Sequence, residues 1–472
     1  MMYLAVEQRA EHGRGFPLAS MDDFRWVNEL VSLRDPLPTA SSNSPQSHVV
    51  QWVYERLAVD VKPARKRGDG HQNEMLQLEE DDTDLVLISS VLLRGRRSSF
   101  INIDCGIPEN SSYLDQSLGI TYVSDAQFID TGVNHDVSPA YVSDLARRYL
   151  TVRSFPDGPR NCYTFKSMTP GLKYLIRATF LYGNYDFENS PSIQFDLYLG
   201  VNLWKNIRLT EPTSYFLTEA ITEATADLIS VCLVNTGRGT PFISGLDLRP
   251  MVASLYPLVN ASRSLVLLNR FNMAPTDGVN DHFGIPSKVM QTAVYPVNST
   301  KLELSFTPDP GDLNEFYAVM YFAELQQNAS RHFSVFLNGA LLNDAKPLTP
   351  DFLTSDAIYS INPSAGYGEL NISLVATESS TLPPLLNAVE VFSTMRNTNV
   401  ATDGGDGNVL PRLCSWRCFT SLTASVDAMM AIKGLYQVKK NWMGDPCSPK
   451  AYTWDGLKCA LNASGVPRLT TL

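Results

Sequence analysis

The feature that most constrains the fold of this chain is an internal repeat. Residues 229–248 align without a gap on residues 372–391, and the pattern of apolar positions matches better than the identities do. Two blocks upstream repeat in the same order, the first of them pairing Phe180 with Phe322. Coincidental similarity among strands is the alternative, but a preserved order of blocks favours two copies of one domain.

Each copy is predicted to consist of β-strands. Apolar and polar residues alternate in runs such as KLELSF at 301–306, and turn sequences such as the Pro-Asp-Pro-Gly at 308–311 separate the runs. Strict alternation is the pattern of a half-buried strand, and proline and glycine supply the backbone angles of chain reversals. The sequence therefore predicts an all-β protein with tandem domains at 100–250 and 264–393.

The first 99 residues differ from the rest. A basic cluster at 62–67 is followed by an acidic cluster at 79–84, and no sustained strand pattern is present. Such charge blocks are typical of solvated segments. Residues 1–99 are therefore predicted to be an atypical, mostly disordered N-terminal segment.

The C-terminal region is predicted to be a linker and a small cap. The linker spans 394–424, and 425–472 opens with a helix that Ser425 can cap. Cys447 and Cys459 favour a disulfide, because no histidine or second cysteine pair stands at zinc-ligand spacing. The final residues have the Leu-x-x-Leu spacing that opens a leucine-rich repeat.

Several classes of function are disfavoured by composition and motifs. The formal charge of -11 opposes attraction to nucleic acid. No apolar run reaches the length of about 18 residues that a membrane-spanning helix needs. We find no phosphate-binding loop, nucleophile elbow or zinc-protease motif, and the histidines of the β region are isolated in sequence. We expect no catalytic residues, no metal and no cofactor.

The evidence on compartment is divided. The N-terminus has no recognisable secretory signal, which favours the cytosol. The chain also contains seven cysteines and six Asn-x-Ser/Thr sequons, which suit an oxidising, glycosylating compartment. The predicted glycosylation sites are Asn110, Asn260, Asn298, Asn328, Asn371 and Asn462. For Cys105, Cys162 and Cys232 we favour a role as small buried hydrophobic residues over disulfide bonding.

Several long strings in the chain resemble a known family. They are FINIDCG (100–106), YLTVRSFPDGPRNCYTF (149–165), LIRATFLYGNYD (175–186), VCLVNTGRGTPFISGLDLRP (231–250) and W-x-GDPC…W-x-G-x-x-C (442–459). Together they resemble the plant malectin-like receptor ectodomains, particularly those of leucine-rich-repeat receptor kinases. The resemblance implies tandem malectin-like β-sandwiches on the extracellular side of the plasma membrane, or secreted, and a leucine-rich-repeat N-terminal cap at 425–472. It also implies a membrane helix and a kinase, neither of which this sequence contains.

The chain departs from the family pattern at two places. Family members normally carry a signal peptide just before the strand at 100–106, where this chain has unrelated residues. Residues 408–424 look like an insertion into the linker, and they carry two cysteines, Cys414 and Cys418, with no counterpart in the pattern.

A candidate ligand site lies in the loop Tyr182-Gly183-Asn184-Tyr185-Asp186. Sugar rings stack on aromatic side chains while their hydroxyls need planar polar partners, and this loop offers both. The alternative is a pair of tyrosines packed at the rim of a sandwich. The animal lectin that names the fold implies a further acidic residue, but Arg238 stands near that position. The candidate ligand-binding residues are Tyr182, Tyr185, Asp186 and Arg238.

The predicted function is a non-catalytic extracellular recognition module of the receptor-like kinase family. Its ligand would be a cell-wall carbohydrate, a peptide or a co-receptor ectodomain. The alternative is a soluble carbohydrate-binding lectin or an accessory protein of a carbohydrate-active enzyme.

Overall fold

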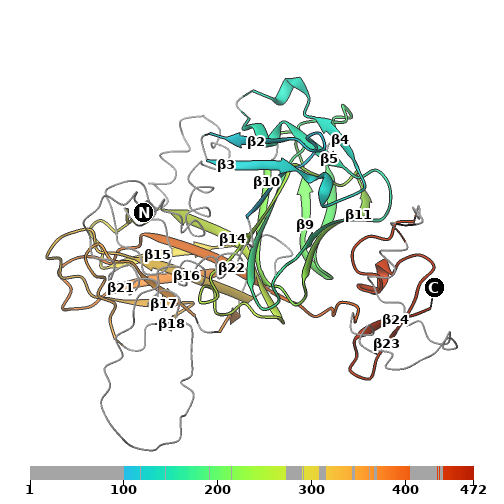
Figure 1. The fold of residues 1–472 in the computed structure, drawn as a ribbon. Coiled ribbons are helices and arrows are strands. Elements are labelled where there is room, and N and C mark those ends of the chain that lie inside the picture. The colour runs from blue at the N-terminus through green and yellow to red at the C-terminus, as the bar shows by residue number, and fades with distance from the viewer. Residues whose placement is uncertain are drawn as a thin grey trace, which may run out of the picture. The chain divides into compact units, whose positions relative to one another are not determined.

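The computed structural model describes residues 100–471 except 117–118, 144, 191, 214, 273–289, 291, 308–314, 343–345, 361, 366–368, 404–432, 434 and 436–439. Strands form most of the regular structure there (Figure 1). Four short 3-10 turns accompany them: η1 (Asp125–Gln127), η2 (Pro139–Tyr141), η3 (Arg147–Tyr149) and η5 (Lys450–Tyr452). The all-β prediction is confirmed, and the predicted N-terminal segment lies outside the described residues.

One large sheet runs through both repeated domains. Its strands are, in spatial order, β19 (Asp356–Tyr359), β16 (Glu315–Phe322), β22 (Ala388–Arg396), β14 (Arg263–Asn272), β10 (Tyr215–Glu223), β7 (Lys173–Leu181), β13 (Gly245–Pro250), β1 (Ile101–Asp104), β3 (Ile120–Ser124) and β2 (Ser112–Asp115), with β20 (Ser364–Ala365) paired to β16. Strands β1 and β3 pair in parallel, and the other pairs in this sheet are antiparallel.

Two smaller sheets complete the two sandwiches. The first contains β6 (Arg160–Lys166), β11 (Leu228–Arg238), β8 (Ile193–Leu199) and β9 (Asn202–Leu209), and the second contains β15 (Lys301–Phe306), β21 (Leu370–Ala376), β17 (Phe333–Leu337) and β18 (Ala340–Leu341). Shorter pairings are β12 (Phe242–Ile243), β5 (Thr151–Ser154) and β4 (Val133–Asp136) at one rim, and β23 (Lys458–Leu461) with β24 (Pro467–Thr471) at the C-terminus.

The repeat found in the sequence corresponds to matching strands. In the first sandwich β13 pairs with β7, placing Leu246 opposite Ala178. In the second sandwich β22 pairs with β16 in the same direction, placing Val389 opposite Met320. These residues are partners in the sequence alignment as well, so the repeated blocks fold with the same register.

Each sandwich has its own core between its large-sheet and small-sheet strands. Along β8, the side chains of Ile193, Phe195 and Leu197 point into the first core, while Gln194 and Asp196 between them face outward. Strand β7 is buried on both faces, because Leu175 packs in a separate apolar cluster on the face away from this core. The alternation read from the sequence therefore holds in strands such as β8, β15, β17 and β21 of the small sheets and disappears in the centre of the large one.

A row of buried polar and charged side chains crosses the large sheet on the face away from the two cores. The row is Asn102, Asp247, Arg177, Glu219, Arg270 and Glu390, one on each of β1, β13, β7, β10, β14 and β22. Arg177, Glu219, Arg270 and Glu390 form ion pairs with one another, as burial of charge requires. The row passes from one sandwich to the other between Glu219 and Arg270, whose Oε2 and Nη1 atoms lie 2.8 Å apart.

The segment that joins the sandwiches covers this face. Tyr256 and neighbouring apolar residues pack against the sheet, and the Tyr256 hydroxyl donates to Glu390 Oε2 over 2.8 Å. The Lys173 ammonium donates to three backbone carbonyls of the same segment, at Ala253, Leu255 and Tyr256, over 2.9 to 3.0 Å. The connection is therefore part of the folded structure.

The C-terminal cap has a small core of its own. The rings of Trp442 and Trp454 stack at 5.4 Å between centroids, beside the disulfide of Cys447 and Cys459. Leu469 of β24 is buried against them. The predicted helix after Ser425 and the predicted insertion at 408–424 lie almost wholly outside the described residues.

One cysteine prediction is wrong. Cys162 and Cys232 form a disulfide, whereas the sequence favoured buried thiols for both. The two cysteines lie directly opposite each other on β6 and β11, with a Cα–Cα distance of 4.0 Å. Because they are 70 residues apart in sequence, only the strand pairing brings them together. Cys105 is a buried free thiol, as predicted.

Candidate ligand-binding site

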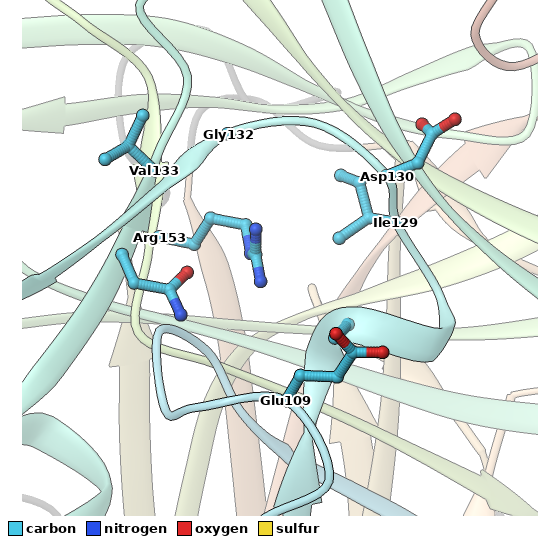
Figure 2. Close-up of a pocket in the computed structure, with 8 residues that line it drawn as sticks. Glu109, Ile129, Asp130, Gly132, Val133 and Arg153 are labelled. Atoms are coloured by element: carbon cyan, nitrogen blue, oxygen red, sulfur yellow. The ribbon is translucent and has the colours of Figure 1, made fainter. Parts of the chain in front are cut away.

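A pocket opens at the rim of the first sandwich, between the loop after β1, the turn η1 and strands β4 and β5. Its volume is about 490 Å³, within the size range of small-ligand sites. The residues that line it are Glu109, Ala126, Ile129, Asp130, Gly132, Val133, Asn134 and Arg153. Figure 2 shows the side chains of Glu109, Ile129 and Arg153 around the opening.

Arg153 provides a fixed positive group in this pocket. Its Nε and Nη2 atoms donate to the two carboxylate oxygens of Asp125 over 2.6 and 2.7 Å, and its Nη1 donates to the Thr131 carbonyl over 3.1 Å. Tyr163 donates to the same carboxylate over 2.9 Å. Burial disfavours the charge, but the bonds to Asp125 outweigh it and raise the pKa of Arg153. These bonds use three of the five N–H donors of a guanidinium.

The rim of the pocket combines acceptors with apolar surface. Glu109 is exposed, and the Asn134 amide nitrogen donates to the Ile107 carbonyl over 3.2 Å. Asp130 pairs with Lys433 over 3.1 Å. Ile129 adds an aliphatic surface. A hydroxyl both donates and accepts, so a polyhydroxylated ligand could bond to the guanidinium and to a carboxylate at once.

The predicted loop site has buried tyrosines. Tyr182 and Tyr185 are 1% and 4% exposed, and the ring of Tyr185 packs on Phe242 at 5.3 Å between centroids. The Tyr182 hydroxyl donates to Asp186 Oδ1 over 2.5 Å. In this structure the two rings therefore pack within the sandwich, the alternative weighed from the sequence, and neither lines the pocket.

Arg238 lies elsewhere, on the outer face of the first small sheet. It follows an irregularity in the pairing of β11 with β8 and donates to Gln194 Oε1 over 3.0 Å. Gln194 in turn donates to Asn206, and Asn206 donates to Asp196 over 2.7 Å. Arg238 is thus one end of an exposed row of planar polar side chains across three strands.

Sequence reasoning missed Asp125 and Arg153. Arg153 stands in the middle of the string YLTVRSF, and Asp125 directly follows a strand, so both could have been flagged as charges inside apolar patterns. Their pairing across 28 residues could not have been read from spacing.

In the part of the chain that the structure describes, no three metal-ligating side chains gather in one place. Within the same residues, no helix has the length and apolar character needed to cross a membrane.

Comparison with known families agrees with this architecture. The profile of the malectin-like domain matches residues 103–280 and 274–394. The fold is also that of solved tandem malectin-like ectodomains. The ANX2 ectodomain from Arabidopsis thaliana aligns with a TM-score of 0.51 at 16% identity, covering 64% of this chain and 98% of that one. The plant receptor-like kinase FER aligns with a TM-score of 0.50 at 16% identity, covering 63% and 97%.

The chain belongs to the malectin-like domain family. It is similar to the putative leucine-rich repeat receptor-like serine/threonine-protein kinase At2g19230 of Arabidopsis thaliana, with 36% identity over 80% of this chain and 45% of that protein. The LRR receptor-like serine/threonine-protein kinase IOS1 of the same plant is 34% identical over 80% of this chain and 43% of its own length. The chain spans about half the length of the curated relatives it matches.

Proposed function

We propose that this chain is a non-catalytic recognition module of a plant leucine-rich-repeat receptor-like kinase, and that its pocket binds the end of a cell-wall carbohydrate. The observation that supports this ligand class is the pocket itself, in which a fixed guanidinium, a carboxylate and an aliphatic side chain surround about 490 Å³. Sugars present hydroxyls and apolar C–H faces to such groups.

An extracellular location follows from the same proposal. Two disulfides and exposed sequon asparagines suit the surface of the plasma membrane or secretion. A soluble lectin would use the same pocket and would differ only in whether a kinase belongs to the same protein. The exposed row that ends at Arg238 is proposed as a second contact area, for a peptide or a co-receptor ectodomain, and the ligand roles of Tyr182, Tyr185 and Asp186 stay predictions.

The proposal is tested by titrating the glycosylated full chain with plant-wall oligosaccharides in a calorimeter. We expect Glu109→Ala to weaken binding by about tenfold, the equivalent of one lost hydrogen bond to a charged group. Glu211→Ala removes an exposed glutamate of the same sandwich outside the pocket and is the matched control. Equal affinities of wild type and Glu109→Ala for every bound sugar would argue against this pocket.

Mass spectrometry of the same mixtures tests the non-catalytic part. We expect the oligosaccharides to be recovered intact after prolonged incubation. Shorter products that require the folded protein would show an enzyme instead. Binding of a peptide or an ectodomain without any bound sugar would favour the other ligand classes.

A further inference from the structure

Two of the strings that carry the family resemblance meet in space. One is the Pro-Arg-Asn-Cys at 159–162 at the start of β6, and the other is the Gly-Asp-Pro-Cys at 444–447 in the cap. The side chain that joins them is Arg160, which is 3% exposed. Its guanidinium nitrogens lie within hydrogen-bond distance of four cap carbonyl oxygens, at Met443 (2.5 Å), Asp445 (2.7 Å), Tyr452 (3.0 Å) and Ser448 (3.2 Å).

The four carbonyls make a site that suits a guanidinium. Arginine presents several N–H donors in a rigid plane, which a lysine ammonium cannot reproduce. Burial lowers the pKa of Arg160 to about 10, with Asp445 acting in the opposite direction, so the side chain stays protonated at neutral pH. Removing the guanidinium would leave buried carbonyls without these donors, which is unfavourable.

Gly444 lets the cap approach the sheet closely. Its φ is +64°, and a Cβ atom there would lie 2.7 Å from the Sγ of Cys162 and 3.1 Å from the Sγ of Cys232. The cap backbone therefore runs directly over the disulfide between β6 and β11. The preceding residue, Met443, has a side chain that is 6% exposed and packs in the core cluster of the first sandwich.

Asp445 and Tyr452 shape the cap loop around Arg160. The Asp445 carboxylate accepts from the backbone nitrogens of Cys447 and Ser448 over 2.9 and 2.7 Å, which closes the loop. The Tyr452 ring packs edge-on against Tyr198 of β8, with centroids 5.9 Å apart.

A second contact lies on the path of the chain toward the cap. Asn399, just after the second sandwich, accepts from and donates to Asn202 in the first sandwich over 3.3 and 2.9 Å. A few residues later, the Thr402 backbone nitrogen donates to Asp445 Oδ2 over 2.7 Å. The linker is thus bonded to the sandwich on one side and to the cap on the other.

We propose that these contacts form a joint, meaning an interface that holds the cap against the first sandwich in one orientation. Arg160 is the positioning residue at its centre. The Pro-Arg-Asn-Cys and Gly-Asp-Pro-Cys strings are then two halves of one interface. Leucine-rich repeats following such a cap would start from a fixed direction relative to the pocket of the first sandwich. The joint does not depend on which ligand the pocket binds.

Hydroxyl-radical footprinting of the full chain, read by mass spectrometry, tests the joint. Met443 reports on the joint, and Met320, fully buried in the second sandwich, reports on global folding. In Arg160→Ala we expect Met443 to oxidise at least about tenfold faster than in wild type, because several hydrogen bonds to a charged group are lost. Met320 should stay protected. Arg208→Ala, which removes an exposed arginine from the same sheet, should leave both rates unchanged.

Protection of Met443 in folded Arg160→Ala at the wild-type rate would overturn the proposal. If Arg160→Ala fails to fold, Met320 will also oxidise, and two milder variants then test the joint. Arg160→Lys keeps a cation at position 160, and Tyr452→Ala changes the cap and leaves the sandwich intact. Fast oxidation of Met443 alone in either variant supports the joint. Slow oxidation in both overturns it.

Discussion

At the scale of single residues, burial has a clear effect on the pKa of Asp104. It is fully buried at the end of β1, and it accepts hydrogen bonds from Tyr113 over 2.7 Å and from Thr151 over 2.9 Å. Burial raises its pKa from 3.8 to about 6, although both hydrogen bonds act in the opposite direction. Between about pH 4 and pH 6, the folded protein therefore holds a proton on Asp104 that the unfolded chain has already lost.

This shift predicts a pH dependence of stability. Between about pH 4 and pH 6 the folded state binds more protons than the unfolded state, so the free energy of unfolding falls as the pH rises through this window. Linkage puts the full loss at about 3 kcal/mol. We expect Asp104→Asn to remove this contribution, so that the free energy of unfolding falls less over this window than in wild type, measured by urea denaturation at a series of pH values.

Asp157→Asn, at an exposed turn of the same sandwich, is the control and should keep the wild-type profile. A profile of Asp104→Asn that still falls between pH 4 and 6 by the wild-type amount would contradict the assignment to Asp104.

At the scale of elements, the pairing of β10 with β14 joins the two sandwiches into one sheet. The register places Ala220 opposite Val266 and Ile221 opposite Leu265. Beside these apolar pairs, Arg270 bonds to Glu219 in the first sandwich and to Glu390 in the second, each over 2.8 Å. Burial opposes the charge of Glu219, but its two arginine partners outweigh burial and lower its pKa.

The buried ion pair of Glu219 and Arg270, beside the pairing of β10 with β14, predicts a strong energetic coupling between these two side chains. Removing one partner of a buried ion pair leaves the other uncompensated, so Glu219→Gln should destabilise the chain by about 3–5 kcal/mol. Glu219→Gln combined with Arg270→Gln should cost less than the sum of the single variants, with a coupling energy of at least about 1 kcal/mol. Guanidinium denaturation measures all three variants.

The exposed pair of Lys301 and Glu303 provides the comparison, since their side chains are 45% and 64% exposed. Glu303→Gln should change stability by less than about 0.5 kcal/mol. Additive effects of Glu219→Gln and Arg270→Gln would mean that the two sandwiches are not coupled through this pair.

At the scale of the whole molecule, the sequons define which surfaces a glycan would cover. Five of the six asparagines are exposed: Asn110, Asn260, Asn298, Asn328 and Asn371. Asn462 is partly buried, and its Oδ1 accepts from the backbone nitrogens of Ser464 and Val466 over 2.9 Å. Three of the five exposed sites, Asn298, Asn328 and Asn371, lie in the second sandwich, and Asn260 lies in the segment just before its first strand.

Glycosylation is testable on the secreted protein. When the chain is expressed behind a working signal peptide, we expect glycosidase treatment to lower its mass, and glycopeptide mapping to find glycans on the exposed asparagines. The material from cytosolic expression serves as the unglycosylated reference. A mass that glycosidase leaves unchanged would remove the main support for an extracellular location.

The sequence by itself determined the all-β class, the duplication and the family. Alternating runs such as the one in β8 and the matched blocks in β7 and β16 are local or collinear signals, and the chain keeps them whatever its tertiary contacts. The spacing of Cys447 and Cys459 is a signal of the same local kind. Tertiary structure alone decided which distant side chains meet. The disulfide of Cys162 with Cys232, the Asp125–Arg153 pair in the pocket and the Arg160 joint each depend on strands or loops far apart in sequence. The buried placement of Tyr182 and Tyr185 has the same origin, because an aromatic residue has the same sequence signal in a core as at a binding surface. A linear pattern records which face of a strand a residue occupies, but the partner on that face is chosen by sheet order and register, which only the folded chain fixes.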